Sequence, residues 1–154
     1  MLRALSNFFD QTFGEDGGDT SASRERELKL ATAVLLVEVA RADFAEEELE
    51  LDAVADLLKA HLAMSRSEVE QLVAEARQHA DRAASLQSFT RQLHEELAAE
   101  EKLKIVEMLW EVALADEVLD KHEDHLVRKV AGLLYISHSD LIRVRNRVQE
   151  RRGV

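Results

Sequence analysis

The sequence predicts an all-α protein, a bundle of about seven helices built from an internal pseudo-two-fold repeat. Three observations carry this prediction. The 154 residues include no proline and only 5 glycines, the two residue types that helix interiors tolerate least. Apolar residues make up 46% of the chain and recur at helical spacing, without sustained period-two alternation. Finally, two stretches that start 73 residues apart resemble each other.

A short N-terminal segment precedes the helical domain. Residues 1–13 carry apolar side chains three to four positions apart, which is typical of an amphipathic helix. Its Phe8, Phe9 and Phe13 either dock on the chain's own domain or contact a partner or a membrane surface. Residues 14–23 are small, polar and acidic, and we predict that they form a flexible linker.

Three helices are predicted in the first half of the domain. Residues 24–42 are apolar over most of their surface, which favours a central, largely buried helix. Residues 47–62 show a single apolar stripe. Ser65 and Glu68 form a capping box, so the next helix is expected over residues 66–80.

The second half continues in the same way. Residues 86–97 are a shorter amphipathic segment, and residues 99–115 are again apolar on most sides, which predicts a second buried helix. Residues 120–134 carry one apolar stripe. Ser137 starts the last predicted helix, which runs to about Arg151.

The repeat explains this order of helices. Residues 30–43 align with residues 103–116, with identical leucine, glutamate, valine, alanine and aspartate positions. Each half, about 28–80 and 101–151, contains one buried helix that cannot be covered within that half. We therefore predict that the two buried helices pack together in one domain over residues 24–152.

Composition excludes several classes of function. The net charge of −11 argues against binding nucleic acid, which requires a cationic surface. The absence of cysteine excludes disulfides, thiolate metal sites and cysteine nucleophiles. No apolar run approaches the roughly 20 residues that cross a bilayer, and no secretory signal is seen, so we expect a cytoplasmic protein without direct membrane insertion. The chain has no nucleophile elbow, phosphate-binding glycine loop or zinc-protease motif, and we expect no enzymatic activity.

Acidic residues gather where the two buried helices end. Asp116, Asp120 and Glu123 stand at positions i, i+4 and i+7, so three carboxylates are expected to crowd at this junction. The first half repeats the spacing with a second set, namely Asp43, Glu47 and Glu50.

Two interpretations of these acids stay open. Asp120 and Glu123 match a helix start, where acids cap the chain and suit the helix dipole. Asp43 and Asp116 stand at predicted helix ends, where the dipole disfavours an anion. The alternative is therefore a site for a divalent cation, and oxygen ligands suit Ca²⁺ or Mg²⁺. The pair His122 and His125 is a weaker candidate for a transition-metal site.

Other charged residues of the predicted helices are expected to pair with opposite charges. Glu38 and Glu111 occupy equivalent positions in the two buried helices, and a buried carboxylate needs a salt bridge or a raised pKa. The last helix is rich in arginine, and we expect it to meet an acidic surface, its own or a partner's.

Residues 33–43, 109–123 and 136–141 resemble the tellurite-resistance protein B-like (TerB-like) family, and the resemblance covers about residues 24–150. The sequence ADEVLDKHE at residues 115–123 carries the family's Ala-Asp-x-x-Leu-Asp-x-x-Glu signature. In the first half, Glu46 stands where the family prefers an aliphatic residue.

The resemblance implies an all-helical domain of about seven helices, metal binding at the acidic junctions, and a link to tellurite and other chemical stress. The implied ligands are Asp116, Asp120 and Glu123, together with Asp43, Glu47 and Glu50. Some relatives are interaction domains of membrane-associated co-chaperones, so a protein partner is expected. The alternative is a metal-free interaction module that uses the N-terminal phenylalanines or the arginine-rich helix.

Overall fold

Seven α-helices and no strand make up the part of the chain that the computed structural model describes, residues 19–42, 48–81, 86–115 and 119–153. The all-α class predicted from the sequence is confirmed. Apart from the start of the first of these helices, the predicted boundaries agree with the observed ones within two residues. The helices are α2 (Asp19–Ala40), α3 (Glu48–Leu62), α4 (Arg66–Asp81), α5 (Leu86–Glu96), α6 (Ala99–Ala113), α7 (Lys121–Leu133) and α8 (His138–Arg152).

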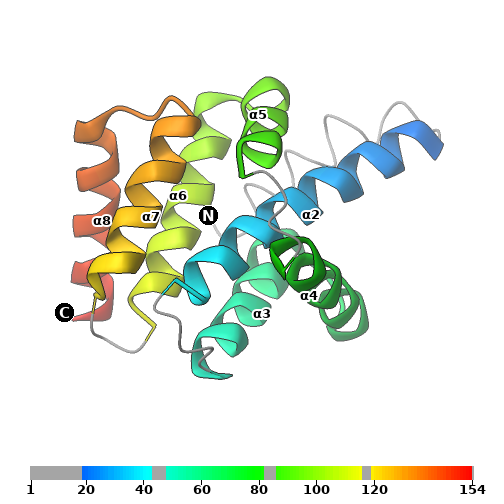
Figure 1. Cartoon of the computed structure of the whole chain (residues 1–154), viewed down its shortest axis with the longest axis horizontal. Coiled ribbons are helices and arrows are strands. Elements are labelled where there is room, and N and C mark those ends of the chain that lie inside the picture. The colour runs from blue at the N-terminus through cyan, green and yellow to red at the C-terminus, as the bar shows by residue number, and fades with distance from the viewer. Residues whose placement is uncertain (1–18, 43–47, 82–85, 116–118, 154) are drawn as a thin grey trace.

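Helix α2 is the centre of the molecule, as its apolar surface predicts. Every residue from Ala31 to Val37 is buried, so all sides of this stretch are covered by protein. The helix contacts α3, α4, α5, α6 and α7. In Figure 1, α2 crosses the molecule with α3 and α4 below it and α5, α6 and α7 above it and to its left.

Helix α6 is the second buried helix. Residues from Ile105 to Trp110 are buried without interruption, and α6 contacts α2, α3, α7 and α8. The indole of Trp110 is fully buried in this core, and its Nε1 has no hydrogen-bond partner among the described residues. The two most apolar helices of the sequence therefore share one core, as the arrangement of the two halves predicts.

The flexible linker predicted for residues 14–23 is wrong at its end, because α2 already begins at Asp19. Aspartate, serine and threonine are favoured at helix starts, where they accept hydrogen bonds from free N–H groups and suit the helix dipole. The first residues of α2 are of these types, and they lack the apolar periodicity that identifies the rest of the helix. Residues 1–18, which include the predicted amphipathic helix with Phe8, Phe9 and Phe13, lie outside the described residues.

Serine caps start two of the helices as predicted. The Ser65 Oγ accepts a hydrogen bond from the Glu68 N–H at 3.2 Å, and the Glu68 carboxylate accepts one from the Ser65 N–H at 3.4 Å. Hydrogen bonds that the Glu68 carboxylate accepts from the Ser65 side chain and from the Ser65 N–H lower the pKa of Glu68. At the start of α8, the Ser137 Oγ accepts from the Asp140 N–H at 3.2 Å. Each cap satisfies an N–H group that the helix itself leaves unpaired.

The turns that lead into these two caps have the same backbone conformation. Ala63 has a φ of 50° and Tyr135 a φ of 61°, both in the left-handed region that non-glycine residues rarely adopt. Each residue lies two positions before the capping serine, so the two turns are equivalent in the alignment of the halves. This similarity agrees with an internal repeat, while the duplication itself stays a prediction.

Candidate functional site

The N-terminus of α7 carries two of the predicted site residues. Asp120 is the N-cap of the helix, and its Oδ1 accepts a hydrogen bond from the His122 N–H at 2.7 Å. The capping interpretation is therefore confirmed for Asp120. The bond fixes the side chain beside the junction that joins α6 to α7.

Glu123 lies in the first turn of α7 and is fully buried, with 0% of its surface exposed. Glutamate is among the residues that proteins bury least often, because a charge removed from water needs compensation. The sequence marks Glu123 as one acid of a set, but it does not indicate this burial. The carboxylate therefore belongs to the interior side of the junction rather than to a solvated helix face.

The other predicted ligands are not among the described side chains. Asp43, Glu47 and Asp116 lie outside the described residues, and Glu50 belongs to the first turn of α3 without a described side chain. Within the described ranges, no group of three His, Asp or Glu side chains is arranged to hold a metal ion. Metal binding by the two predicted sets of three acids, one at each junction, stays a prediction.

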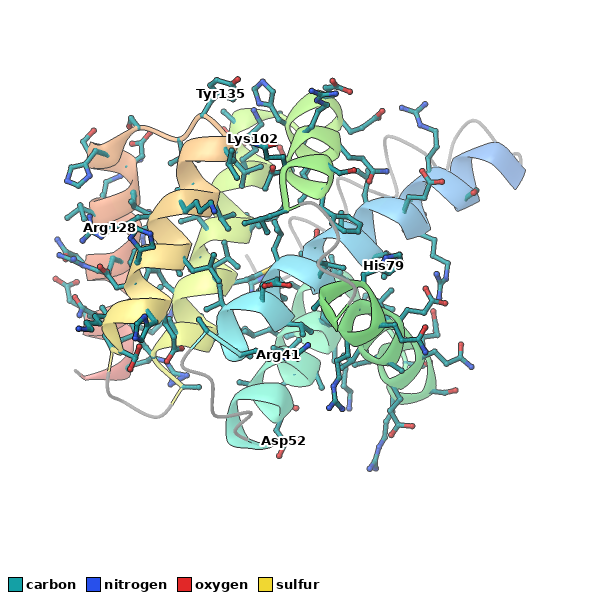
Figure 2. The ribbon with its side chains drawn as sticks, in the orientation of Figure 1. Arg41, Asp52, His79, Lys102, Arg128 and Tyr135 are labelled. Carbon is teal, nitrogen blue, oxygen red and sulfur yellow. The ribbon has the colours of Figure 1, made fainter. Side chains whose placement is uncertain are left out.

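The described helix ends that flank the two acidic segments lie at one edge of the molecule in the view of Figure 1. The end of α2, the start of α3, the end of α6 and the start of α7 all lie toward the bottom of that view. Figure 2 shows Arg41 and Asp52, which follow the end of α2 and the start of α3, in the same lower region, with Tyr135 at the opposite edge.

A second charged group joins α6 to α8. The Arg151 guanidinium donates to Glu107 at 2.8 Å and also to Glu111. Arg152 lies 3.3 Å from the Glu111 carboxylate and donates to the Glu111 carbonyl oxygen at 3.3 Å. The hydrogen bond to Glu111 is the main cause of the raised pKa of Arg151. The expected salt bridge of Glu111 is thus confirmed, and the arginine-rich helix meets an acidic surface of its own chain.

A pocket of about 370 Å³ lies beside this group, between α3, α6 and α8. Leu57 and Ala60 contribute its apolar wall, and His61 and Lys104 contribute polar groups. Sequence reasoning assigned no role to His61. A signal was present, because His61 stands three residues after Leu58 and four after Leu57, on the apolar stripe of its helix.

His61 is 7% exposed, and burial lowers the pKa of its imidazole. The charges of four neighbouring residues have smaller effects on this pKa than burial has. Glu107 and Glu111 raise it, whereas Lys104 and Arg151 lower it. Because the folded-state pKa lies below the unfolded value of 6.5, the unfolded chain binds more protons as the pH falls past that value. Stability is therefore lost on acidification from neutral pH, and this loss is complete below the folded-state pKa.

We expect His61→Gln to remove this part of the pH dependence. As the pH falls from about 7.5 to about 5, the unfolding free energy of the variant should decrease less than that of the wild type. Urea unfolding followed by circular dichroism at several pH values measures the difference. His125→Gln, on the exposed face of α7, is the matched control. An equal shift in that control would contradict the assignment to His61.

None of the seven helices in the described part of the chain is both long enough and apolar enough to cross a bilayer.

Comparison with known proteins identifies the family. The family model described as tellurite resistance protein TerB matches residues 29–146, which is most of the helical domain. Comparisons with curated proteins and with solved structures found no match. The matched range runs from α2 into α8 and includes the junction at Asp120 and Glu123. The chain belongs to the TerB family and carries a domain of the tellurite-resistance type.

Proposed function

We propose that this TerB domain binds a divalent cation at the junction between α6 and α7, through Asp116, Asp120 and Glu123, and acts on a protein partner in a stress response without catalysing a reaction. The full burial of Glu123 beside the N-cap Asp120 is the observation that supports the proposal most. A cation would add to the interactions that this carboxylate already makes.

The chemistry of the junction fits a hard cation. Its acidic residues offer only oxygen ligands, which Ca²⁺ and Mg²⁺ prefer. Between the end of α6 and the first turn of α7 the chain carries more acids than bases. The carboxyl end of α6 carries the negative end of a helix dipole, which attracts a cation. The amino end of α7 carries the positive end of a dipole, which repels a cation, and the carboxylates of Asp120 and Glu123 offset this repulsion. The net field therefore favours a positive ion.

The repeat suggests a second, equivalent site in the first half. Asp43, Glu47 and Glu50 would supply its carboxylates, and Glu46 replaces the aliphatic residue of the family pattern. The described helix ends on either side of both segments lie at the same edge in Figure 1. We propose the second-half junction as the main site and the first-half junction as a subsidiary one.

Thermal unfolding in Ca²⁺, Mg²⁺ or Mn²⁺ tests the cation site. A ligand that binds only the folded state at ten times its Kd stabilises it by about 1.4 kcal/mol, which raises the Tm of a chain of this size by about 3–6 °C. We expect Asp116→Asn combined with Asp120→Asn to abolish this rise. Asp56→Asn combined with Glu100→Gln removes two exposed acids elsewhere and should keep it. No rise at millimolar cation in the wild type would contradict the proposal.

The alternative is a metal-free interaction module. Arg151 and Arg152 are engaged with α6, so the part of α8 that remains for a partner centres on the exposed Arg143 and Arg147. Arg143 is itself paired with Asp140 at 2.8 Å. Two results together would favour this alternative: divalent cations do not change the Tm of the wild type, and Arg147→Glu abolishes binding of the partner.

A further inference from the structure

The pocket between α3, α6 and α8 combines an apolar wall with polar groups from two helices. Its volume of about 370 Å³ is in the range of sites for small organic molecules. Leu57 and Ala60 lie on the α3 side, and Lys104 lies on the α6 side. Such a pocket can hold a molecule that has a hydrocarbon body and one polar end.

The carboxylates at this pocket are already engaged. Arg151 donates to both Glu107 and Glu111, and Arg152 lies 3.3 Å from the Glu111 carboxylate. A ligand cation would have to displace these guanidinium groups. The acidic side chains of the pocket therefore act as partners for arginine rather than as open acceptors.

Two hydrogen-bond donors of the pocket, unlike its carboxylates, make no hydrogen bond within the described part of the chain. The Lys104 Nζ lies 3.8 Å from the nearest Glu107 oxygen, which is an ion pair but too long for a hydrogen bond. His61 is nine-tenths buried and has no hydrogen bond to any residue in the described ranges. Both side chains line the pocket, so their N–H groups are available to a molecule inside it.

The local balance of charge also favours an anion. Among the residues that line the pocket, Lys104 and Arg151 balance the carboxylates of Glu107 and Glu111. Arg152, which pairs with Glu111 but does not line the pocket, adds one further positive charge in a chain with a net charge of −11. A single carboxylate would neutralise it. A phosphate prefers more donors than one ammonium and one imidazole supply.

We propose that this pocket binds a small aliphatic monocarboxylate, whose carboxylate accepts hydrogen bonds from Lys104 and His61 and whose hydrocarbon chain covers Leu57 and Ala60. This site uses none of the residues of the proposed cation site, so the two proposals succeed or fail separately.

Titration of the ¹⁵N-labelled full chain with hexanoate, followed by amide NMR shifts, tests the proposal. We expect saturable shifts at residues 57–61 and 104 and weaker binding of hexanol, which lacks the charge. Lys104→Met should weaken hexanoate binding about tenfold or more, because a charge-assisted hydrogen bond is lost. Lys59→Met removes an exposed lysine of α3 and should leave the affinity within about twofold.

His61→Leu provides a second variant that keeps the positive charge of Lys104. We expect His61→Leu to weaken the binding of hexanoate. The variant should still bind hexanol more weakly than it binds hexanoate. The proposal is overturned if hexanoate causes no saturable shift at these residues, if Lys104→Met binds it as tightly as the wild type, or if hexylammonium binds better than hexanoate. The last result would mean that Glu107 and Glu111, not the donors, determine what the pocket accepts.

Discussion

Replacing Trp110 by alanine is expected to lower the free energy of unfolding by about 3–5 kcal/mol. The indole is fully buried in α6, the helix that contacts α2, α3, α7 and α8. Its removal takes apolar surface out of the core and leaves a cavity that four neighbouring helices cannot readily fill.

Urea unfolding followed by circular dichroism measures this loss, since the variant lacks the chain's single tryptophan. Trp110→Phe is the informative control. It keeps most of the apolar volume and removes an Nε1 that has no hydrogen-bond partner in the described part of the chain, so it should cost clearly less than alanine. A loss below about 1 kcal/mol in Trp110→Ala would show that α6 is not central to the core.

Arg151→Met is expected to lower the free energy of unfolding by about 2–3 kcal/mol. The change removes the guanidinium that joins α8 to Glu107 and Glu111 and leaves Glu107, which is 5% exposed, with Lys104 as its remaining partner. Loss of one partner of a fully buried ion pair costs about 3–5 kcal/mol. The side chain of Arg151 is 45% exposed, and solvent screening reduces the expected cost.

A double-mutant cycle with Glu107→Gln separates the ion pair from other effects of the substitution. The two changes together should cost less than the sum of the single changes, because both remove the same interaction. Arg147→Met, on the exposed face of the same helix, is the matched control and should cost less than about 0.5 kcal/mol. Additive effects in the cycle would contradict a direct stabilising pair between Arg151 and Glu107.

Most of the fold could be predicted from the sequence because its signals are local. Continuous apolar surface identifies α2 and α6, and serine followed by an acid three residues later identifies the starts of α4 and α8. The apolar pattern places the start of α2 too late, since Asp19 and the polar residues after it favour a helix terminus but carry no apolar periodicity.

The candidate sites were less predictable because they depend on contacts between distant residues. The acids near Asp120 are visible as a spacing, but the burial of Glu123 depends on how α7 packs against its neighbours. Likewise, the bond from Arg151 to Glu107 joins positions 44 residues apart, and no local pattern indicates it. The surroundings of His61 depend on the packing of α3 against α6, which no local pattern indicates.

Paramagnetic broadening by Mn²⁺ tests the proposed cation site most directly, since Mn²⁺ can replace Ca²⁺ or Mg²⁺ at oxygen ligands. At substoichiometric Mn²⁺ we predict that the amide signals of residues 119–124 broaden first, while those of residues 66–75 in the acidic but unrelated α4 stay sharp. Asp116→Asn combined with Asp120→Asn should remove the selective broadening. Uniform broadening across the acidic surface, or broadening that begins at α4, would contradict a cation site between α6 and α7.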